Sequence, residues 1–378
     1  ALFLCSTSNQ LLKSNDGLLV CGDRLATEVI TYLFLLLAHT SLQGPLQLVC
    51  IGHSLGGLIL RAALPGILSE APIPLEPCAY YSLQTPHLGC RRPTGGLGSF
   101  LWRSVFHTTL ESIGGLTGEE LLLEDEAHVL HQLSEFGGPF MTSLSRFHHC
   151  TFVAQPFDDW LVPYCSASAV VLNGHPSPSP DRPPFAVASH SGFPAQYAAL
   201  LDDYQWRPHI GSRCCWTTSC GDPTPRRSQS SRHPTAQDPL THTSSRPPCS
   251  SSTEAAGGSQ TLVSQGRGGD FCVDSELQVE YSARMLAQLR VGLPQLRNLN
   301  LQFGPHWAPV HYHMVPIRQG LGNIEAGAEF VQLFTELIAI DLQEESSTAL
   351  GTAAAAAAAQ SVCPPLPHPG SSEGSPDQ

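Results

Sequence analysis

Short apolar runs alternate with longer helical patterns through the first half of the chain. Residues 46–52 (LQLVCIG) form a continuous apolar run after a Gly-Pro pair, which is typical of a strand buried on both faces. Residues 78–86 and 150–156 are further β-like runs, each closed by a proline. This alternation predicts an α/β fold with a mostly parallel sheet and helices on both of its faces.

Helical periodicity fills the intervals between these runs. Residues 24–39 combine a charged first turn with a strongly apolar body, and apolar residues recur at helical spacing from Gly52 until Pro65, where we expect the helix to end. Glycines bound a turn at residues 17–22. The apolar start, residues 1–7, reads as the end of a strand.

The second half of the chain changes character twice. Residues 206–269 are dominated by Ser, Thr, Pro, Arg and Gly, and we expect a disordered insert there. Residues 270–345 return to amphipathic helical patterns around a β-like stretch at 307–318, and should complete the domain begun by residues 1–205. A low-complexity tail, residues 346–378, follows.

The pentapeptide GHSLG at residues 52–56 is the strongest chemical signal. It fits G-x-S-x-G between a buried strand and a helix, which is the context of a nucleophile elbow. The tight turn would hold the Ser54 hydroxyl above the sheet, the glycines would leave room for it, and the N–H of Leu55 would bind a developing oxyanion. The alternative is a glycine-rich turn with a capping serine. His53 is expected to be structural.

A reactive serine needs an acid and then a histidine, in this order along the chain. Asp158 and Asp159 follow the strand predicted at 150–156, and either can serve as the acid. Among the histidines, His190 precedes the insert. Three others cluster after the insert: His306, His311 and His313. Strand alternation places the last two on one face, so only one of them is expected to be catalytic.

Four stretches in order resemble the DUF676 family of putative serine esterases, which are lipase-like α/β-hydrolases that include the yeast ROG-type lipases. These stretches are STSNQLLKSNDGLLVCGDRLATEV, IGHSLGGLILRAAL, SLQTPHLGC and DDWLVPYCSAS. The resemblance covers roughly residues 1–170 and, weakly, 295–340. It implies an α/β-hydrolase fold. By position it also implies Ser54 as nucleophile, Asp159 as acid and His311 as base, with His313 left open.

Two further features concern the resemblance. His87, in the TPHLG stretch, falls on a structural loop of the family and is not expected to be the base. The family's His-Gly motif, whose loop supplies a second oxyanion donor, has no match in this chain and is expected upstream of Ala1. Loss of one such donor lowers the rate by about 10²–10³.

These residues predict a serine hydrolase that cleaves the carboxylic esters of lipids. The reaction would use a Ser-Asp-His triad and an acyl-enzyme intermediate, and would need no metal or cofactor. Two alternatives stay open: another acyl-transfer enzyme (a thioesterase or acyltransferase), or a non-catalytic hydrolase-like protein that binds partners through the insert. Residues 90–149 are rich in leucine, and form either a lid over an acyl chain or part of the core.

Charge and cysteine usage narrow the expected partners and location. The net charge is −13 and no basic patch stands out, which argues against nucleic-acid binding. The cysteines lie mostly within apolar runs, and the longest apolar run, residues 29–39, is too short to span a membrane. We therefore expect a cytoplasmic or membrane-peripheral protein. One polar stretch carries three cysteines close together: Cys214, Cys215 and Cys220. No second pair of cysteines or histidines has the spacing of metal ligands, so no metal site is expected there.

Overall fold

The fold is α/β, as the alternating runs predict. The computed structural model describes residues 2–42, 44–90, 114–157, 159, 161–170, 183, 185–205, 276–303 and 327–344. Its sheet has the order β1-β2-β3-β5-β4, in which every neighbouring pair is parallel except β4 and β5. The strands are β1 (Leu46–His53), β2 (Leu75–Leu83), β3 (His149–Ala154), β4 (Phe185–Ser191) and β5 (Arg297–Phe303).

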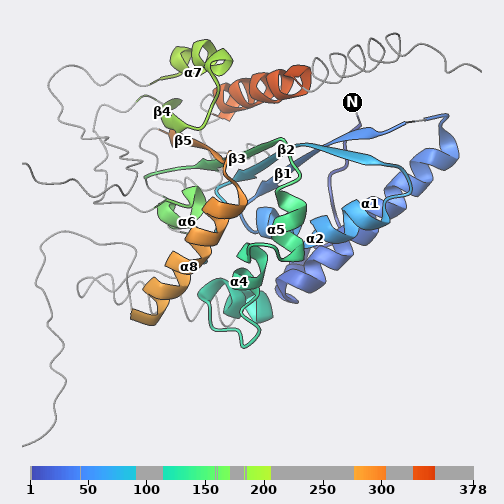
Figure 1. Ribbon diagram of the computed structural model, residues 1–378, viewed down its shortest axis with the longest axis horizontal. Coiled ribbons are helices and arrows are strands. Elements are labelled where there is room, and N and C mark those ends of the chain that lie inside the picture. Colours follow the sequence, from blue (N-terminus) through green and yellow to red (C-terminus); the bar gives the residue numbers. More distant parts are fainter. Residues whose placement is uncertain are drawn as a thin grey trace, which may run out of the picture. The chain divides into compact units, whose positions relative to one another are not determined.

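Helices cover both faces of this sheet (Figure 1). On one face lie α1 (Leu18–His39), α2 (Leu55–Glu70), α4 (Val129–Ser134), α5 (Pro139–Leu144), α6 (Tyr164–Ser168) and α8 (Glu276–Gly292). On the other face lie η2 (Ala195–Tyr197), α7 (Ala198–Asp203) and a helix over residues 327–344. A short 3-10 helix, η1 (Leu11–Asn15), precedes α1, and residues 114–122 are also helical.

The two layers create two apolar cores, and β2 shows how one strand serves both. Tyr80 packs in the core beside α2, whereas Tyr81 packs in the opposite core with Phe334. Because successive side chains of a strand point to opposite faces, both tyrosines are fully buried. Burial on both faces is the reason why β2 and β3 read as continuous apolar runs. For residues 46–52 the predicted burial on both faces is wrong, because β1 ends the strand order and its Ile51 is 48 % exposed.

The helix predicted at residues 24–39 begins six residues earlier, at Leu18, so the predicted turn at 17–22 is wrong. Only Gly17 has the positive φ of a turn, at 99°. Gly22 lies inside α1, where an added Cβ would come within 2.6 Å of the Cβ of Ala62 in α2. This glycine therefore allows two helices to approach closely.

The predicted end of α2 at Pro65 is also wrong, since the helix continues to Glu70. A proline inside a helix costs about 3 kcal/mol. Ile67 lies beyond the proline and is only 1 % exposed, and burying such a side chain contributes about 1.5–3 kcal/mol. Core packing thus offsets the lost backbone hydrogen bond.

The strand predicted at residues 1–7 is absent from residues 2–7, which are exposed and have no regular secondary structure. Instead this segment is bound to α1 through one carboxylate. Glu28 accepts hydrogen bonds from the hydroxyl of Ser6 and the backbone N–H groups of Thr7 and Ser8. Burial alone would raise the pKa of Glu28, but these hydrogen bonds outweigh it and lower the pKa.

Strands β4 and β5 were not expected from the apolar runs. In β5 the apolar residues Leu299, Leu301 and Phe303 alternate with polar ones, and all three are buried. The polar positions Asn300 and Gln302 are buried as well. A strand with polar residues inside the sheet lacks the continuous apolar run that marked the other parallel strands.

Residues 114–149 pack on the core through a set of buried apolar side chains: Leu121, Val129, Leu130, Leu133, Met141, Leu144 and Phe147. The remainder of the region predicted as a lid, residues 91–113, lies outside the described residues, as do the predicted insert at 206–269, the β-like stretch at 307–318 and the tail. Among the described residues, five cysteines are buried and form no disulfide: Cys21, Cys50, Cys78, Cys90 and Cys150.

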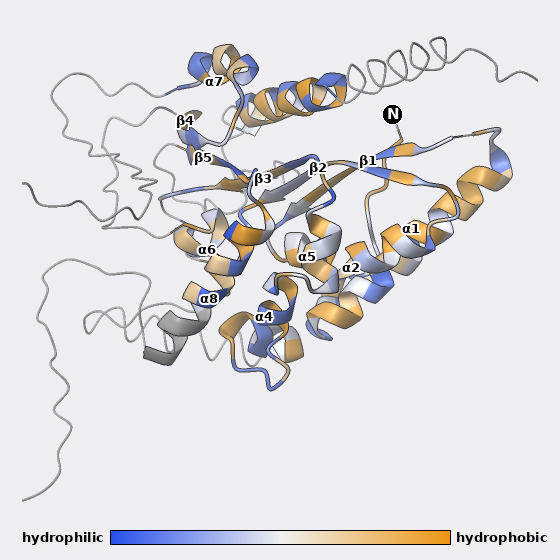
Figure 2. Cartoon of the chain, in the orientation of Figure 1, coloured by the Kyte–Doolittle hydropathy of each residue, from blue (hydrophilic) through white to orange (hydrophobic). Residues whose placement is uncertain are grey.

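Apolar residues, orange in Figure 2, run along α1. Phe34 and Leu35 are each more than half exposed. Within the described residues, none of the helices combines the length and apolar character needed to span a bilayer.

Glu120 joins the helix over residues 114–122 to the start of α1, and it carries a pH-dependent prediction. Its carboxylate accepts the backbone N–H of Leu18 at 2.7 Å, and burial, with Asp125 and Glu119 nearby, raises its pKa from 4.5 to about 7. The folded protein therefore holds this proton more tightly than the unfolded chain, and stability falls as the pH rises from about 4.5 to about 7. We expect Glu120→Gln to reduce this loss by an amount on the order of 2 kcal/mol, measured by urea unfolding at pH 5 and pH 8.

The matched control is Glu126→Gln, which removes the same charge from an exposed position that does not contribute to the raised pKa of Glu120. It should leave the difference between the two pH values unchanged. If Glu120→Gln shows the wild-type difference as well, the proton does not reside on Glu120.

Candidate active site

Ser54 lies in a strained turn between β1 and α2. Its φ is 53° and its ψ is −128°, a sparsely populated conformation with positive φ that costs a non-glycine residue roughly 1–3 kcal/mol. The backbone N–H of Ser54 donates to the carbonyl of Leu83 at 2.8 Å, which ties the turn to the neighbouring strand β2. The serine therefore stands at the carboxyl end of the sheet, before the first turn of a helix.

Two glycines around this turn are required by close packing. An added Cβ at Gly52 would lie 2.5 Å from the Cα of Gly57, and one at Gly57 would lie 2.1 Å from Oγ1 of Thr85. Gly56, the last glycine of the pentapeptide, has nothing within 4 Å of such a Cβ. The expectation that both motif glycines leave room for the turn thus holds for Gly52 and is wrong for Gly56. The glycine after the motif supplies the second close approach.

Leu55 is the first residue of α2. The N–H groups of the first helical turn have no acceptor within their own helix, and the helix dipole favours negative charge at this end. A developing oxyanion beside Ser54 would face these groups.

Asp159 lies in the loop that follows β3, as its sequence position predicts. Its Oδ1 accepts the backbone N–H groups of Leu161 at 2.8 Å and Val162 at 2.9 Å, which folds the loop around the carboxylate. The alternative acid, Asp158, lies outside the described residues.

The sheet register brings the serine and the acid to one edge. His53 pairs with Leu83, and Leu83 pairs with Val153, so β1, β2 and β3 end side by side. Between them lies Gln84, a buried residue whose side chain contacts the loop of Asp159 at both of its ends. Sequence reasoning missed Gln84, for which the only signal is a polar residue between a buried strand and Pro86.

The three late histidines, His306, His311 and His313, lie outside the described residues. Strand β5 runs parallel to β3 and ends at Phe303, so the chain leaves the sheet at the edge that carries Ser54. The three histidines follow in the sequence.

The comparison with protein families agrees with this arrangement. Residues 1–170 match the family described as Putative serine esterase (DUF676). This part of the chain belongs to the DUF676 family. The match includes the elbow and the loop of Asp159, and membership in this esterase family indicates a hydrolase. Neither the curated proteins nor the solved structures contain a match to the chain.

His87 belongs to the DUF676 region but is engaged elsewhere. Its Nδ1 lies 3.2 Å from the guanidinium of Arg61, and its Nε2 lies 2.8 Å from Oγ of Ser82. Because arginine only donates, Nδ1 must accept and Nε2–H must donate to Ser82. The ring also stacks on Phe152, and burial together with Arg61 holds the pKa of His87 well below its usual range. Both ring nitrogens are therefore occupied by partners other than Ser54.

Arg61 is a buried cation on α2 that sequence reasoning missed. Its guanidinium donates to the carbonyl of Leu133 at 2.6 Å and to Oγ of Ser134 at 3.3 Å. Burial lowers the pKa of Arg61 to about 10, so it stays charged at neutral pH. It links α2, behind the elbow, to α4 and to His87.

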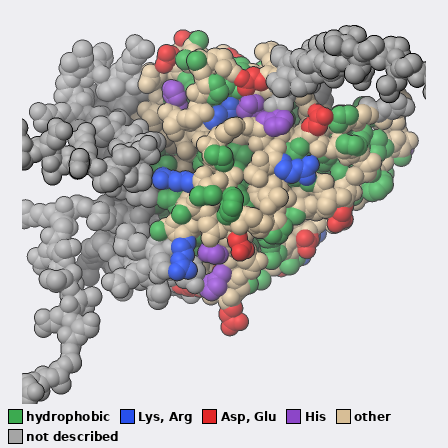
Figure 3. Space-filling view, in the orientation of Figure 1, with side chains coloured by type: hydrophobic (Ala, Val, Ile, Leu, Met, Phe, Trp, Pro, Cys, Tyr) green, Lys and Arg blue, Asp and Glu red, His purple; other side chains and the backbone are tan. Residues whose placement is uncertain are grey.

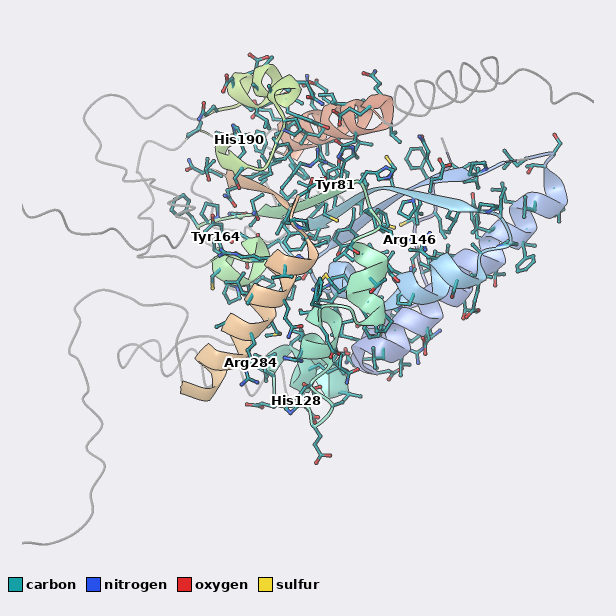
Figure 4. All side chains as sticks on the ribbon, in the orientation of Figure 1. Tyr81, His128, Arg146, Tyr164, His190 and Arg284 are labelled. Atoms are coloured by element: carbon teal, nitrogen blue, oxygen red, sulfur yellow. The ribbon has the colours of Figure 1, made fainter. Side chains whose placement is uncertain are left out.

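His190 lies too far from Ser54 to act as its base. The register aligns His53, Leu83, Val153, Leu299 and His190 in one row across the sheet. Four strand spacings of about 4.8 Å separate the ends of this row, which gives about 19 Å. Figure 4 shows His190 on β4, across the sheet from β1.

One group of acidic and histidine side chains is close enough together to hold a metal ion, on the face of the sheet covered by the helix over residues 327–344. Donor atoms of His149, Asp341 and Glu344 lie within 4.8 Å of one another. Asp341, however, is paired with Arg297 through both oxygens, at 2.9 and 2.7 Å. A guanidinium in this position repels a cation, so we describe the group as an ion-pair network. The three close cysteines named above lie outside the described residues.

Charged side chains are dispersed on the face of the molecule shown in Figure 3, where Lys and Arg stand singly among acidic and apolar residues. The absence of nucleic-acid partners stays a prediction.

Proposed function

We propose that the protein is a serine esterase in which Ser54 is the nucleophile. The observation that carries this proposal is the strained, positive-φ backbone of Ser54 at the junction of β1 and α2, within the region that matches the DUF676 family. A serine that only capped the helix would gain nothing from this strain, whereas a nucleophile needs its hydroxyl clear of the sheet.

The proposed reaction uses residues from three strand ends. The Oγ of Ser54 attacks the ester carbonyl while a late histidine, His311 or alternatively His313, takes its proton. Asp159 orients the imidazole and stabilises its charge, and the N–H of Leu55 binds the oxyanion. The histidine then protonates the leaving alcohol. Water, deprotonated by the same histidine, attacks the acyl-enzyme and releases the carboxylic acid.

Among carboxylic esters we propose lipid acyl esters as the substrate class. The connection from β2 to β3 starts at the edge that carries Ser54, and its sequence over residues 97–113 contains eight large apolar residues among 17. An acyl chain gains more from contact with such side chains than a small polar group does. A series of p-nitrophenyl esters tests the substrate class: kcat/KM should rise from acetate to octanoate, and a preference for acetate would contradict it.

Active-site labelling tests the proposed function directly. We expect a fluorophosphonate probe to form one covalent adduct, and tandem mass spectrometry of the digested protein should place it on Ser54. Heat-denatured protein should not react, because an unactivated serine is a weak nucleophile. Folded protein that stays unlabelled, or is labelled at another serine, would overturn the proposal and favour a non-catalytic protein of the hydrolase fold.

A further inference from the structure

We propose that Gln84 is a positioning residue that couples the loop of Asp159 to the serine elbow. This inference deepens the proposed function and rests on it. Gln84 directly follows β2, the strand that lies between β1 with its elbow and β3 with its acid loop. Its side chain is fully buried, at 0 % exposure, so the substrate does not contact it.

The side-chain amide of Gln84 closes the acid loop at both ends. Its Oε1 accepts the backbone N–H of Gln155 at 2.7 Å, where the loop begins. Its Nε2 donates to the backbone carbonyl of Val162 at 3.3 Å, where the loop ends. One amide therefore spans the segment that contains Asp159.

The far end of this bridge leads directly to the acid. The peptide chain at Val162 is held twice: its carbonyl accepts from Gln84, and its N–H donates to Oδ1 of Asp159 at 2.9 Å. A shift of this residue would therefore move the carboxylate that should orient the catalytic histidine.

The near end of the bridge leads to the elbow. The N–H of Gln84 donates to the carbonyl of Val153 in β3 at 2.8 Å, and the preceding carbonyl, of Leu83, accepts the N–H of Ser54 at 2.8 Å. The last residue of β2 and the residue that follows it thus bind the nucleophile on one side and the acid-bearing strand on the other.

The backbone of Gln84 indicates that the side chain is needed. Its φ is 49°, a left-handed conformation that glycine, or next to it asparagine, would adopt more readily. A buried glutamine in this conformation stores strain beside an equally strained Ser54. The strain is offset by the two hydrogen bonds that only a side chain of this length, with both a donor and an acceptor, makes here.

A double-mutant cycle separates positioning from general stability. Gln84→Met keeps the side-chain length and removes both hydrogen bonds. We expect it to lower kcat for p-nitrophenyl butyrate by about 10–10²-fold with KM within about twofold, because small misplacement of a catalytic group acts on kcat. In an Asp159→Asn background, the same substitution should lower kcat by less than about threefold, since its effect runs through the acid. If the fold-losses in kcat of the two single variants instead multiply in the double variant, the two residues act independently and the inference is wrong.

Two control variants make the result specific. Gln84→Asn suits the left-handed backbone but is too short for the bridge, so it should lose activity as Gln84→Met does. Activity at the wild-type level in Gln84→Asn would show that only the backbone matters and would overturn the inference. Ile67 is a buried residue in the last turn of α2, away from the loop of Asp159. Ile67→Val should therefore lower stability but leave kcat at the wild-type value.

Amide exchange distinguishes failure of this inference from failure of the proposed function. The N–H groups of Leu161 and Val162 should exchange at least tenfold faster in Gln84→Met, while the amides of α2 keep their rates. Unlabelled and inactive wild-type protein would refute the proposed function, and with it the catalytic part of the inference. Active protein with unchanged exchange at these two amides would refute the inference alone.

Discussion

Replacement of Ser54 by alanine is expected to lower kcat/KM for ester hydrolysis by about 10⁴–10⁶-fold and to abolish fluorophosphonate labelling. The hydroxyl oxygen forms the covalent bond to the substrate, and no neighbouring side chain replaces it in this role. The substitution keeps the Cβ, so the turn and its hydrogen bond to Leu83 should remain. Initial rates with p-nitrophenyl butyrate measure the effect, and thermal unfolding checks that the protein is folded.

Ser69→Ala is the matched control for this loss. Ser69 lies at the exposed end of α2, where its hydroxyl donates to the carbonyl of Pro65, and its removal should leave the rate unchanged. Ser54→Gly should be inactive yet more stable by about 1 kcal/mol, because glycine adopts a φ of 53° without strain. Hydrolysis by Ser54→Ala at more than a tenth of the wild-type rate would rule out Ser54 as the nucleophile.

Removal of the charge of Asp341 is expected to produce the largest loss of stability, about 3–5 kcal/mol for Asp341→Asn. Asp341 and its partner Arg297 are 0 % and 2 % exposed, and they join the helix over residues 327–344 to β5. The hydroxyls of Tyr81 and Tyr197 also donate to this carboxylate. Burial would lower the pKa of Arg297, but the bonds to Asp341 raise it instead, so the variant leaves a charged guanidinium without its counterion.

Urea unfolding of three variants tests this account. Glu329→Gln removes an exposed carboxylate from the same helix and should change the unfolding free energy by no more than about 0.5 kcal/mol. The double variant Arg297→Met with Asp341→Leu should be more stable than Asp341→Asn, because no buried charge remains. A change below about 1 kcal/mol for Asp341→Asn would show that the ion pair does not secure the helix.

Apolar runs and helical spacing were sufficient to predict the α/β class and strands β1, β2 and β3. Strands β2 and β3 are buried on both faces, so their buried positions are consecutive in the sequence. Strand β1 also has a continuous apolar run, although it ends the strand order and is only partly buried. The serine elbow was equally readable, because its chemistry needs a particular short motif between a strand and a helix. Strand β5 escaped prediction because polar residues alternate with its leucines and are nevertheless buried.

Glycine and proline misled because their local preferences were outweighed by packing. Gly22 looks like a turn residue, but it lies inside α1 so that α2 can approach. Pro65 looks like a helix end, but the buried Ile67 beyond it holds the helix together. Neither fact is visible until the partner helix or the core is in place.

The sequence by itself determined the chemistry that is available: a serine in an elbow, an acid after a later strand, and histidines after the last. Only the tertiary structure decided which groups can meet, because this depends on strand order and register. It engages both nitrogens of His87, separates His190 from His53, the neighbour of Ser54, by about 19 Å, and places Gln84 between the elbow and Asp159. Hydrogen bonds between residues distant in the chain produce no periodic pattern in the sequence. The proposed coupling of Ser54 to Asp159 could therefore be inferred only from the hydrogen bonds at the carboxyl end of the sheet.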